Sequence, residues 1–140
     1  MKNMRKNNSG FTLLELLIVV VIIGLLAGIV GPKLFKNINK SEVTTAKAQV
    51  DTFVKALDNF RIDTGRYPTT EEGLSALLNS PSNLQGWNGP YLKKNVPTDP
   101  WGTQYQYAAP GQHNDDYDVF SFGKDKKLGG ENDNTDIGNW

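Results

Sequence analysis

The strongest constraint in this chain is an apolar run from Phe11 to Gly31, in which Glu15 is the only charged residue. At about 1.5 Å per residue, a helix over this run spans the ~30 Å hydrocarbon core of a bilayer. The run is too long and too uniformly apolar for the core helix of a small soluble domain. The sequence therefore predicts a helix over 11–31 that crosses a membrane.

Basic residues flank the apolar run on both sides: Lys2, Arg5 and Lys6 before it, and Lys33, Lys36 and Lys40 after it. The basic leader favours a cytoplasmic N-terminus, and the lysines beyond the run weaken that orientation signal. A secretory signal peptide is one alternative, but its apolar segment is usually about 7–15 residues and ends at an Ala-x-Ala-like site. A plain membrane anchor is the other alternative, and it does not account for Glu15.

A carboxylate inside an apolar run is unfavourable in lipid unless it finds a partner, so Glu15 indicates a function. The stretch Gly10–Glu15, with a basic leader before it and an apolar helix after it, resembles the class III signal of type IV pilins and pseudopilins. The resemblance implies that a prepilin peptidase cleaves after Gly10 on the cytoplasmic face and that the new N-terminal Phe11 is N-methylated. The amine created at Phe11 can pair with Glu15 of a neighbouring subunit in low dielectric, so that assembly neutralises the carboxylate.

The end of the apolar run contains residues that weaken a helix. Gly24 and Gly28 form a Gly-x-x-x-Gly pattern, which permits close helix packing in lipid but is also simply common in membrane helices. Pro32 lacks a backbone donor and disfavours helix at Gly31, so we expect a kink or a weak helical stretch between Gly24 and Pro32. The resemblance implies that this stretch melts when subunits leave the bilayer, which gives Pro32 a part in assembly.

After Pro32, apolar residues recur three or four positions apart as far as Phe60, with polar residues between them. This spacing predicts an amphipathic helix that ends by Gly65, where glycine can adopt a left-handed cap conformation. Joined to the membrane segment, it forms one helix of about 54 residues, or roughly 80 Å. The apolar positions are Leu34, Ile38, Val43, Ala46, Val50, Phe53, Val54, Leu57 and Phe60.

Short elements follow the long helix. Thr69 and Glu72 fit a capping box, which predicts a short helix from Thr70 to about Asn79. Residues 80–104 form a loop rich in proline and glycine. We expect three aromatic residues to hold that loop on the core: Trp87, Tyr91 and Trp101.

Two strands, Tyr105–Tyr107 and Tyr117–Phe122, are predicted on either side of a hairpin loop at 110–116. His113, the only histidine, lies among polar residues of that loop. Its position does not favour a catalytic or metal-binding role.

The last segment, from Gly123 to Trp140, is rich in Gly, Asp and Asn. Ca²⁺ prefers carboxylate and carbonyl oxygens with glycine where the chain must bend, so the composition fits a calcium site. Composition alone fits a solvated acidic tail better, and the spacing is not that of an EF-hand.

Four segments, in order, resemble the major pseudopilins of type II secretion systems: Arg66–Leu74, Asp99–Gly102, Phe120–Asp125 and Asp136–Trp140. In that family the C-terminal loop binds calcium, so the resemblance implies a structural Ca²⁺ ion here. It implies Asp125 and Asp136 as side-chain ligands and the carbonyl of Phe122 as a backbone ligand. Some relatives carry a second Asp where this chain has Thr135, and Asp133 in a shifted loop, or a water, is expected to complete the ligand set.

Composition excludes several functions. Fifteen basic and fifteen acidic residues cancel, so the chain has no broad electrostatic footprint for nucleic acid. The absence of cysteine excludes disulfides, and a calcium ion would supply the staple that a small core needs. There is no phosphate-binding glycine loop and no nucleophile elbow, so we predict that the chain is not an enzyme.

The sequence thus predicts an α+β, pilin-like fold, in which a long N-terminal helix packs on a small antiparallel sheet with a C-terminal calcium-binding loop. The expected parts are a leader at 1–10, a transmembrane and filament-core helix at 11–31, and a periplasmic globular domain at 32–140. The resemblance implies a single-pass protein of the bacterial inner membrane, with a cytoplasmic N-terminus, that polymerises into a periplasmic helical filament. That filament would help to export folded proteins across the outer membrane.

The implied partners are further copies of the chain, minor pseudopilins, the inner-membrane secretion platform, the prepilin peptidase and N-methyltransferase, and membrane lipids. One alternative is a type IV pilin for adhesion or motility, although the disulfide-bounded loop of many such pilins cannot form here. The other is a membrane-anchored calcium-dependent binding module that works as a monomer.

Overall fold

The computed structural model describes residues 10–140, and the predicted leader residues 1–9 lie outside the described residues. The chain divides into two compact units that meet between Ile38 and Asn39. A single helix, α1 (Leu13–Thr64), begins in the first unit and ends in the second. The predicted long N-terminal helix is therefore confirmed, starting two residues later than the apolar run.

In the first unit, α1 is apolar and its side chains are exposed. By length and composition this part of the helix could cross a membrane, and none of its most apolar stretch is buried within the described chain. The prediction for Gly24–Pro32 is a kink or a weak helical stretch. The helix continues through these residues, which contradicts the weak stretch and does not contradict the kink. Pro32 removes only the hydrogen bond to the carbonyl of Gly28, and the turns on either side stay helical.

In the second unit, one stripe of α1 is buried and, from Val50 to Phe60, belongs to the hydrophobic core. Its buried residues are Ala46, Val50, Phe53, Ala56, Leu57 and Phe60. From Val50 onward they pack against buried residues from later in the chain: Leu74, Leu77, Leu92, Tyr105, Tyr117 and Val119. The predicted apolar stripe is thus confirmed from Ala46 onward, whereas Leu34 and Ile38 are exposed because they precede the core.

A three-stranded antiparallel sheet, in the order β1-β2-β3, completes the second unit. Strand β1 (Gln106–Ala108) pairs with β2 (Asp118–Ser121), with Tyr107 opposite Val119, which confirms the predicted hairpin. Strand β3 (Ile137–Gly138) pairs with the other edge of β2. The sequence does not predict β3, because a strand of two residues carries no alternation of its own.

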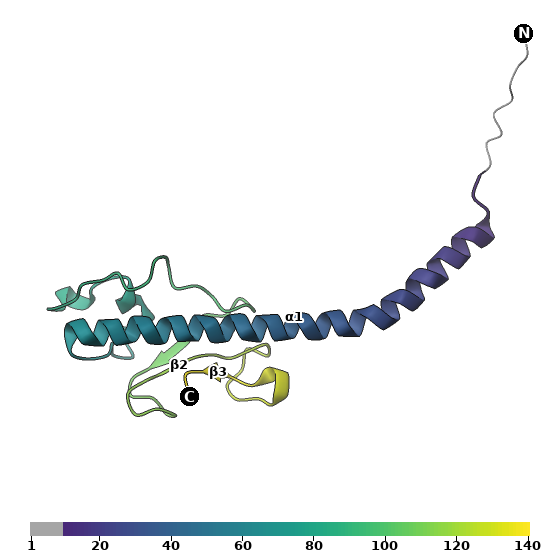
Figure 1. The fold of residues 1–140 in the computed structure, drawn as a ribbon. Coiled ribbons are helices and arrows are strands. Elements are labelled where there is room, and N and C mark those ends of the chain that lie inside the picture. The colour runs from purple at the N-terminus through teal and green to yellow at the C-terminus, as the bar shows by residue number, and fades with distance from the viewer. Residues whose placement is uncertain (1–9) are drawn as a thin grey trace, which may run out of the picture. The chain divides into compact units, whose positions relative to one another are not determined.

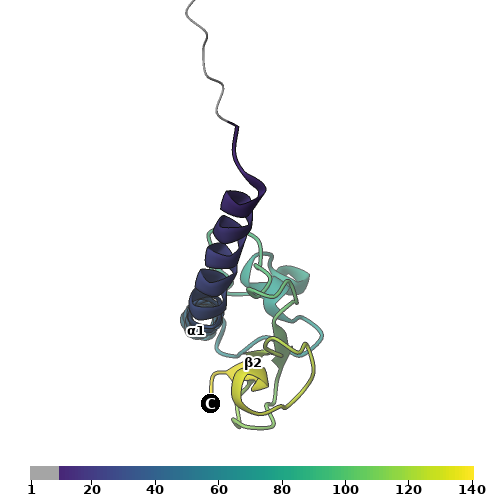
Figure 2. The same cartoon turned by 90° about the vertical axis from the view of Figure 1, so that its right-hand side faces the viewer.

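The sheet lies beside the second half of α1, where Figure 1 shows β2 and β3 next to the helix. Figure 2 looks nearly along this part of α1 and shows the other elements gathered on one side of it. The helix ends at Thr64, and Gly65 has a φ of 80° and donates its N–H to the carbonyl of Arg61 at 2.8 Å. The predicted left-handed glycine cap is therefore confirmed.

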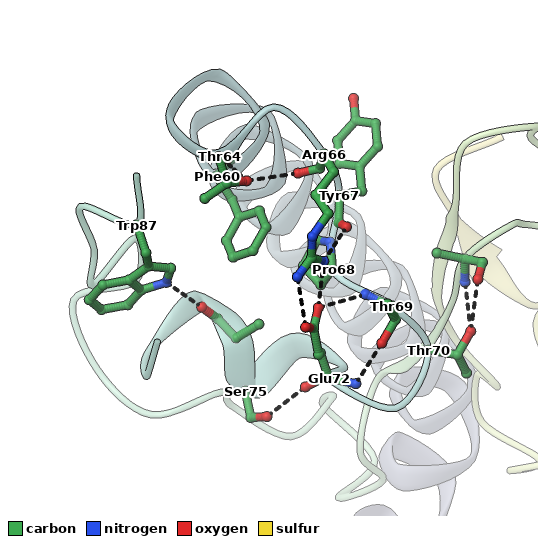
Figure 3. A network of polar contacts seen from close by, with 12 residues as sticks. Phe60, Thr64, Arg66, Tyr67, Pro68, Thr69, Thr70, Glu72, Ser75 and Trp87 are labelled. Atoms are coloured by element: carbon green, nitrogen blue, oxygen red, sulfur yellow. Dashed lines mark hydrogen bonds and ion pairs between the residues drawn. The ribbon is translucent and has the colours of Figure 1, made fainter. Parts of the chain in front are cut away.

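A polar network around Glu72 holds the segment that follows α1 (Figure 3). The N–H of Thr69 donates to Oε2 of Glu72 at 2.9 Å, and the N–H of Glu72 donates to Oγ1 of Thr69 at 3.2 Å. These reciprocal bonds confirm the predicted capping box. The guanidinium of Arg66 donates to both oxygens of Glu72, at 2.7 and 2.8 Å, and this bond holds the pKa of Glu72 below its usual value.

The helix predicted from Thr70 to Asn79 is wrong in extent and type. A turn leads into the 3-10 helix η1 (Leu74–Leu77), because Gly73 has a φ of 58° and a ψ of −164° that end the first helical turn. Two further 3-10 turns, η2 (Pro81–Asn83) and η3 (Asn132–Asn134), lie in the later loops.

Aromatic residues hold the long loop on the core, as predicted. The indole N–H of Trp87 donates to the carbonyl of Ala76 at 2.9 Å, and that of Trp101 donates to the carboxylate of Glu42 at 3.0 Å. The hydroxyl of Tyr91 donates to Oδ2 of Asp63, in the last turn of α1, at 2.8 Å. Each ring is thus fixed by at least one polar contact as well as by packing.

Glu72→Ala is expected to destabilise the second unit by about 1–2 kcal/mol, because it removes both the cap and the Arg66 pair. The melting temperature of the full chain in detergent should therefore be lower than that of the wild type by about 4 °C or more. Because the folded-state pKa of Glu72 is lowered, this stabilisation is present above its unfolded pKa of about 4.3 and is lost as the pH falls through the folded value. Glu71→Ala, at the exposed neighbouring position, is the control, and an equal loss in both variants would contradict the specific role of Glu72.

Candidate functional site

The first candidate site is the start of the described chain. Gly10 and Phe11 precede α1, and both are exposed. The bond predicted to be cleaved therefore lies in a non-helical segment. A peptidase needs an accessible backbone outside a helix, and Gly10 and Phe11 meet both conditions.

Glu15 has a local role that the sequence interpretation missed. Its Oε2 accepts the N–H of Thr12 at 2.8 Å and the hydroxyl of Thr12 at 2.9 Å. Its own N–H donates to Oγ1 of Thr12 at 3.2 Å, which completes a capping box at the N-terminus of α1. The Thr-x-x-Glu spacing carries this signal, and the interpretation of Glu15 as a charge in lipid does not include it.

The second candidate site is the C-terminal loop, and Asp136 is its most informative residue. Oδ2 of Asp136 accepts the N–H of Gly129 at 2.8 Å. Oδ1 is buried and has no hydrogen-bond partner among residues 10–140. A buried carboxylate oxygen without a partner is costly, and a cation is one way to satisfy it.

The other predicted calcium ligands are not gathered around Asp136. Oδ1 of Asp125 accepts the N–H of Lys127 at 3.1 Å, Asp133 is exposed in η3, and Phe122 follows directly after β2. Within the described part of the chain, no three acidic or histidine side chains form a group that could hold a metal. The structure thus places the ligands in one loop without assembling them.

The two ends of this loop nevertheless approach each other. Gly123 has a φ of 73°, and a Cβ added there would lie 3.0 Å from the carbonyl oxygen of Thr135. The hydroxyl of Thr135 donates to the carbonyl of Asn132 at 2.9 Å. The residues on either side of the contact, Phe122 and Asp136, carry two of the predicted oxygen ligands, and oxygen donors suit Ca²⁺. The residue types of this loop, although not their present arrangement, are therefore of the kind that binds calcium.

Asp118, at the opposite end of β2 from this loop, organises the hairpin loop. Its carboxylate accepts the N–H groups of Gln112, His113 and Asn114 at 2.7, 2.9 and 3.0 Å. Burial raises the pKa of Asp118, but these hydrogen bonds outweigh it and hold the pKa below its usual value. The ring of His113 stacks on Trp140, with centroids 3.7 Å apart, so the loop histidine packs against the last residue of the chain.

An exposed apolar helix that begins just after an accessible peptide bond, attached to a small α+β unit, defines the pilin-like class of membrane-anchored subunits. Residues 5–31 match the family model for the prokaryotic N-terminal methylation motif, and residues 33–140 match the model for type II secretion system protein G. The chain therefore belongs to the type II secretion system protein G family.

Individual relatives agree with this assignment. The type II secretion system core protein G of Pseudomonas aeruginosa is 42% identical over 139 residues, which is 97% of each chain. The protein of the same name from Vibrio cholerae is 46% identical over 143 residues, covering 100% of this chain and 96% of that one. The crystal structure of the major pseudopilin from the type 2 secretion system of enterohaemorrhagic Escherichia coli is 38% identical, with a TM-score of 0.64, and the match covers 78% of this chain and 95% of that one. The predicted family and helix-on-sheet fold are confirmed.

Proposed function

We propose that copies of this chain polymerise from the bacterial inner membrane into a periplasmic helical filament that helps to export folded proteins across the outer membrane. The observation that carries this proposal is the order of two matches in one chain. A methylation motif at 5–31 is followed directly by a protein G region at 33–140. The methylation motif would be processed and would anchor the chain in the membrane. The protein G region would form the folded part of each filament subunit.

Processing is the first step of the proposed function. A prepilin peptidase cleaves after Gly10, and an N-methyltransferase modifies Phe11. Since the cut precedes the apolar helix, that helix stays in the mature protein. Lipid covers its exposed apolar side chains before assembly, and neighbouring copies cover them afterwards.

Assembly then depends on Glu15. Its carboxylate and the new amine of Phe11 on a neighbouring copy form an ion pair in a medium of low dielectric, where such pairs are strong. Because one Oε2 atom accepts both bonds of the local cap, the other carboxylate oxygen is left outside it. Minor pseudopilins and the inner-membrane secretion platform complete the proposed set of partners.

The proposed role is structural rather than catalytic, in agreement with the family. We infer no nucleic-acid partner, because the chain carries no net charge. The type IV pilin and the monomeric calcium-dependent module are less well supported, because the relatives described above are type II secretion proteins over nearly the whole chain.

We further propose that a calcium ion stabilises the C-terminal loop. Asp125, Asp136 and Asp133 would hold it through carboxylate oxygens, and Phe122 through its carbonyl. The partnerless Oδ1 of Asp136 and the close approach of Gly123 to Thr135 support this site. The ion, when bound, supplies positive charge that joins the loop to the end of β2, in a chain without disulfides.

The processing step can be tested by Gly10→Val, which should block cleavage because a branched side chain replaces hydrogen at the scissile bond. The wild-type chain purified from its own membranes should have an intact mass that begins at methylated Phe11. The variant should keep its leader and fail to restore secretion in cells that lack the natural chain. The wild-type chain in cells without the peptidase should likewise keep its leader, with a mass that differs from that of the variant only by the change from glycine to valine. A variant of mature mass would contradict the assigned cut.

A further inference from the structure

A chain of hydrogen bonds runs from the loop before β1 to the start of the C-terminal loop. The hydroxyl of Ser121 donates to Oδ2 of Asp99 at 2.5 Å. Oγ of the same serine accepts the N–H of Gly123 at 3.0 Å. One serine hydroxyl thus joins a carboxylate more than twenty positions earlier in the sequence to the first residue of the predicted calcium loop.

Both side chains in this chain of bonds are buried. Asp99 is 3% exposed and Ser121 is 0% exposed. Oδ1 of Asp99 also accepts the N–H groups of Trp101 at 3.1 Å and Thr103 at 2.8 Å, which fixes the orientation of the carboxylate. Donation to a carboxylate polarises the serine hydroxyl and makes its oxygen a stronger acceptor for the N–H of Gly123.

The position of Gly123 is fixed from the other side as well. Its φ of 73° is in the left-handed region, and a Cβ added there would lie 3.0 Å from the carbonyl oxygen of Thr135. The carbonyl of Gly123 accepts the N–H of Lys126 at 3.3 Å, which begins the turn of the loop. The backbone at this residue therefore has little freedom to rotate.

The N–H of Gly123 and the carbonyl of Phe122 belong to the same peptide group. In a planar trans peptide the two groups point in opposite directions. When the N–H is held by Ser121, the carbonyl of Phe122 is directed to the opposite side of the peptide plane. The direction of this carbonyl thus depends on Ser121 and, through it, on Asp99.

We propose that Asp99 and Ser121 are positioning residues for the calcium site, because they orient the carbonyl of Phe122 that binds the ion. This inference rests on the calcium site proposed above. It assigns a role to Asp99 of the Asp-Pro-Trp-Gly turn, which is distant from the loop in sequence. Residues that orient ligands typically change metal affinity by about 10–100-fold when they are removed.

Asp118 provides a matched control on the same strand. It is also 3% exposed, and its carboxylate also accepts several N–H groups, but those belong to the hairpin loop. A merely structural role for Ser121 would make Ser121→Ala and Asp118→Asn behave alike. Both would lower the melting temperature in chelator and leave the calcium affinity unchanged.

The experiment measures Ca²⁺ affinity by competition with a chromophoric chelator, using the full mature chain in detergent, and melting temperature in excess chelator. We expect Ser121→Ala to bind Ca²⁺ about 10–100-fold more weakly than the wild type. Asp118→Asn should stay within about twofold of the wild type, and Ser121→Thr, which keeps a hydroxyl, should restore most of the affinity. If Ser121→Ala fails to fold, Ser121→Cys keeps the size while weakening both hydrogen bonds and should bind more weakly in the same direction.

The outcomes separate this inference from the calcium site itself. Wild-type affinity in Ser121→Ala, or in the Cys variant, overturns the positioning role and leaves the site in place. An equal loss in Ser121→Ala and Asp118→Asn also overturns it, because the effect would then come from general destabilisation. A wild-type chain that takes up no Ca²⁺ overturns the site and this role together.

Discussion

Glu15→Gln is expected to abolish filament formation while the chain still inserts into the membrane. The substitution removes the negative charge that the proposed ion pair with the neighbouring amine requires. It makes the apolar helix easier to accommodate in lipid, since a neutral amide is less costly there than a carboxylate. Cross-linking in native membranes should show the ladder of copies for the wild type and only single chains for the variant, and secretion should fall to the level of cells without the protein.

The local cap makes glutamine the informative replacement. Glu15 accepts the N–H and the hydroxyl of Thr12, and glutamine at this third helical position can accept the same bonds. Glu15→Gln therefore keeps the helix start and removes the charge, whereas alanine would remove both. Any loss of assembly in the glutamine variant then reports the charge and not the stability of the helix end.

Thr12→Ser is the matched control, because serine keeps a hydroxyl that can donate to the carboxylate of Glu15 and accept the N–H of Glu15. It should assemble like the wild type. Extraction of membranes with alkaline carbonate checks that every variant is inserted. Normal assembly of Glu15→Gln would contradict the ion pair, and release of that variant from the membrane would show that the carboxylate serves anchoring instead.

Most of the fold follows from short-range patterns in the sequence. The apolar stripe from Ala46 to Phe60, the glycine cap at Gly65 and the capping box at Thr69 are all local, because each depends on residues within one or two helical turns. The short helix after that box is the instructive failure. Gly73 takes a positive φ, so the turn that the capping box starts ends there, and a separate 3-10 helix follows.

The sheet edge and the candidate site depend on contacts that no local pattern encodes. Strand β3 exists only because β2 offers an edge to Ile137 and Gly138. The bonds from Asp99 to Ser121 join segments far apart in sequence, so no spacing rule could have revealed them. For Glu15, the Thr-x-x-Glu spacing is a local signal for the cap. The assembly role alone does not account for that cap.

Removal of calcium is expected to lower the melting temperature of the full mature chain in detergent by about 10–20 °C. An ion present at 100 times its dissociation constant stabilises the folded state by about 2.7 kcal/mol. For a unit of about 100 residues, each kcal/mol shifts the midpoint by about 4–8 °C. Asp136→Asn removes the negative charge of the carboxylate to which the partnerless Oδ1 atom belongs. The melting temperatures of this variant in calcium and in chelator should therefore be nearly equal.

The control for charge is Asp115→Asn in the exposed hairpin loop, which should keep the full response to calcium. Mg²⁺ is the control for the ion, because it requires short octahedral distances and keeps several waters, which a loop built on Phe122 and Asp136 does not supply. Equal midpoints in calcium and chelator for the wild type would remove the ion from the site. A response to Mg²⁺ as large as that to Ca²⁺ would instead indicate general screening of the acidic tail, and Asp136→Asn would then melt like Asp115→Asn.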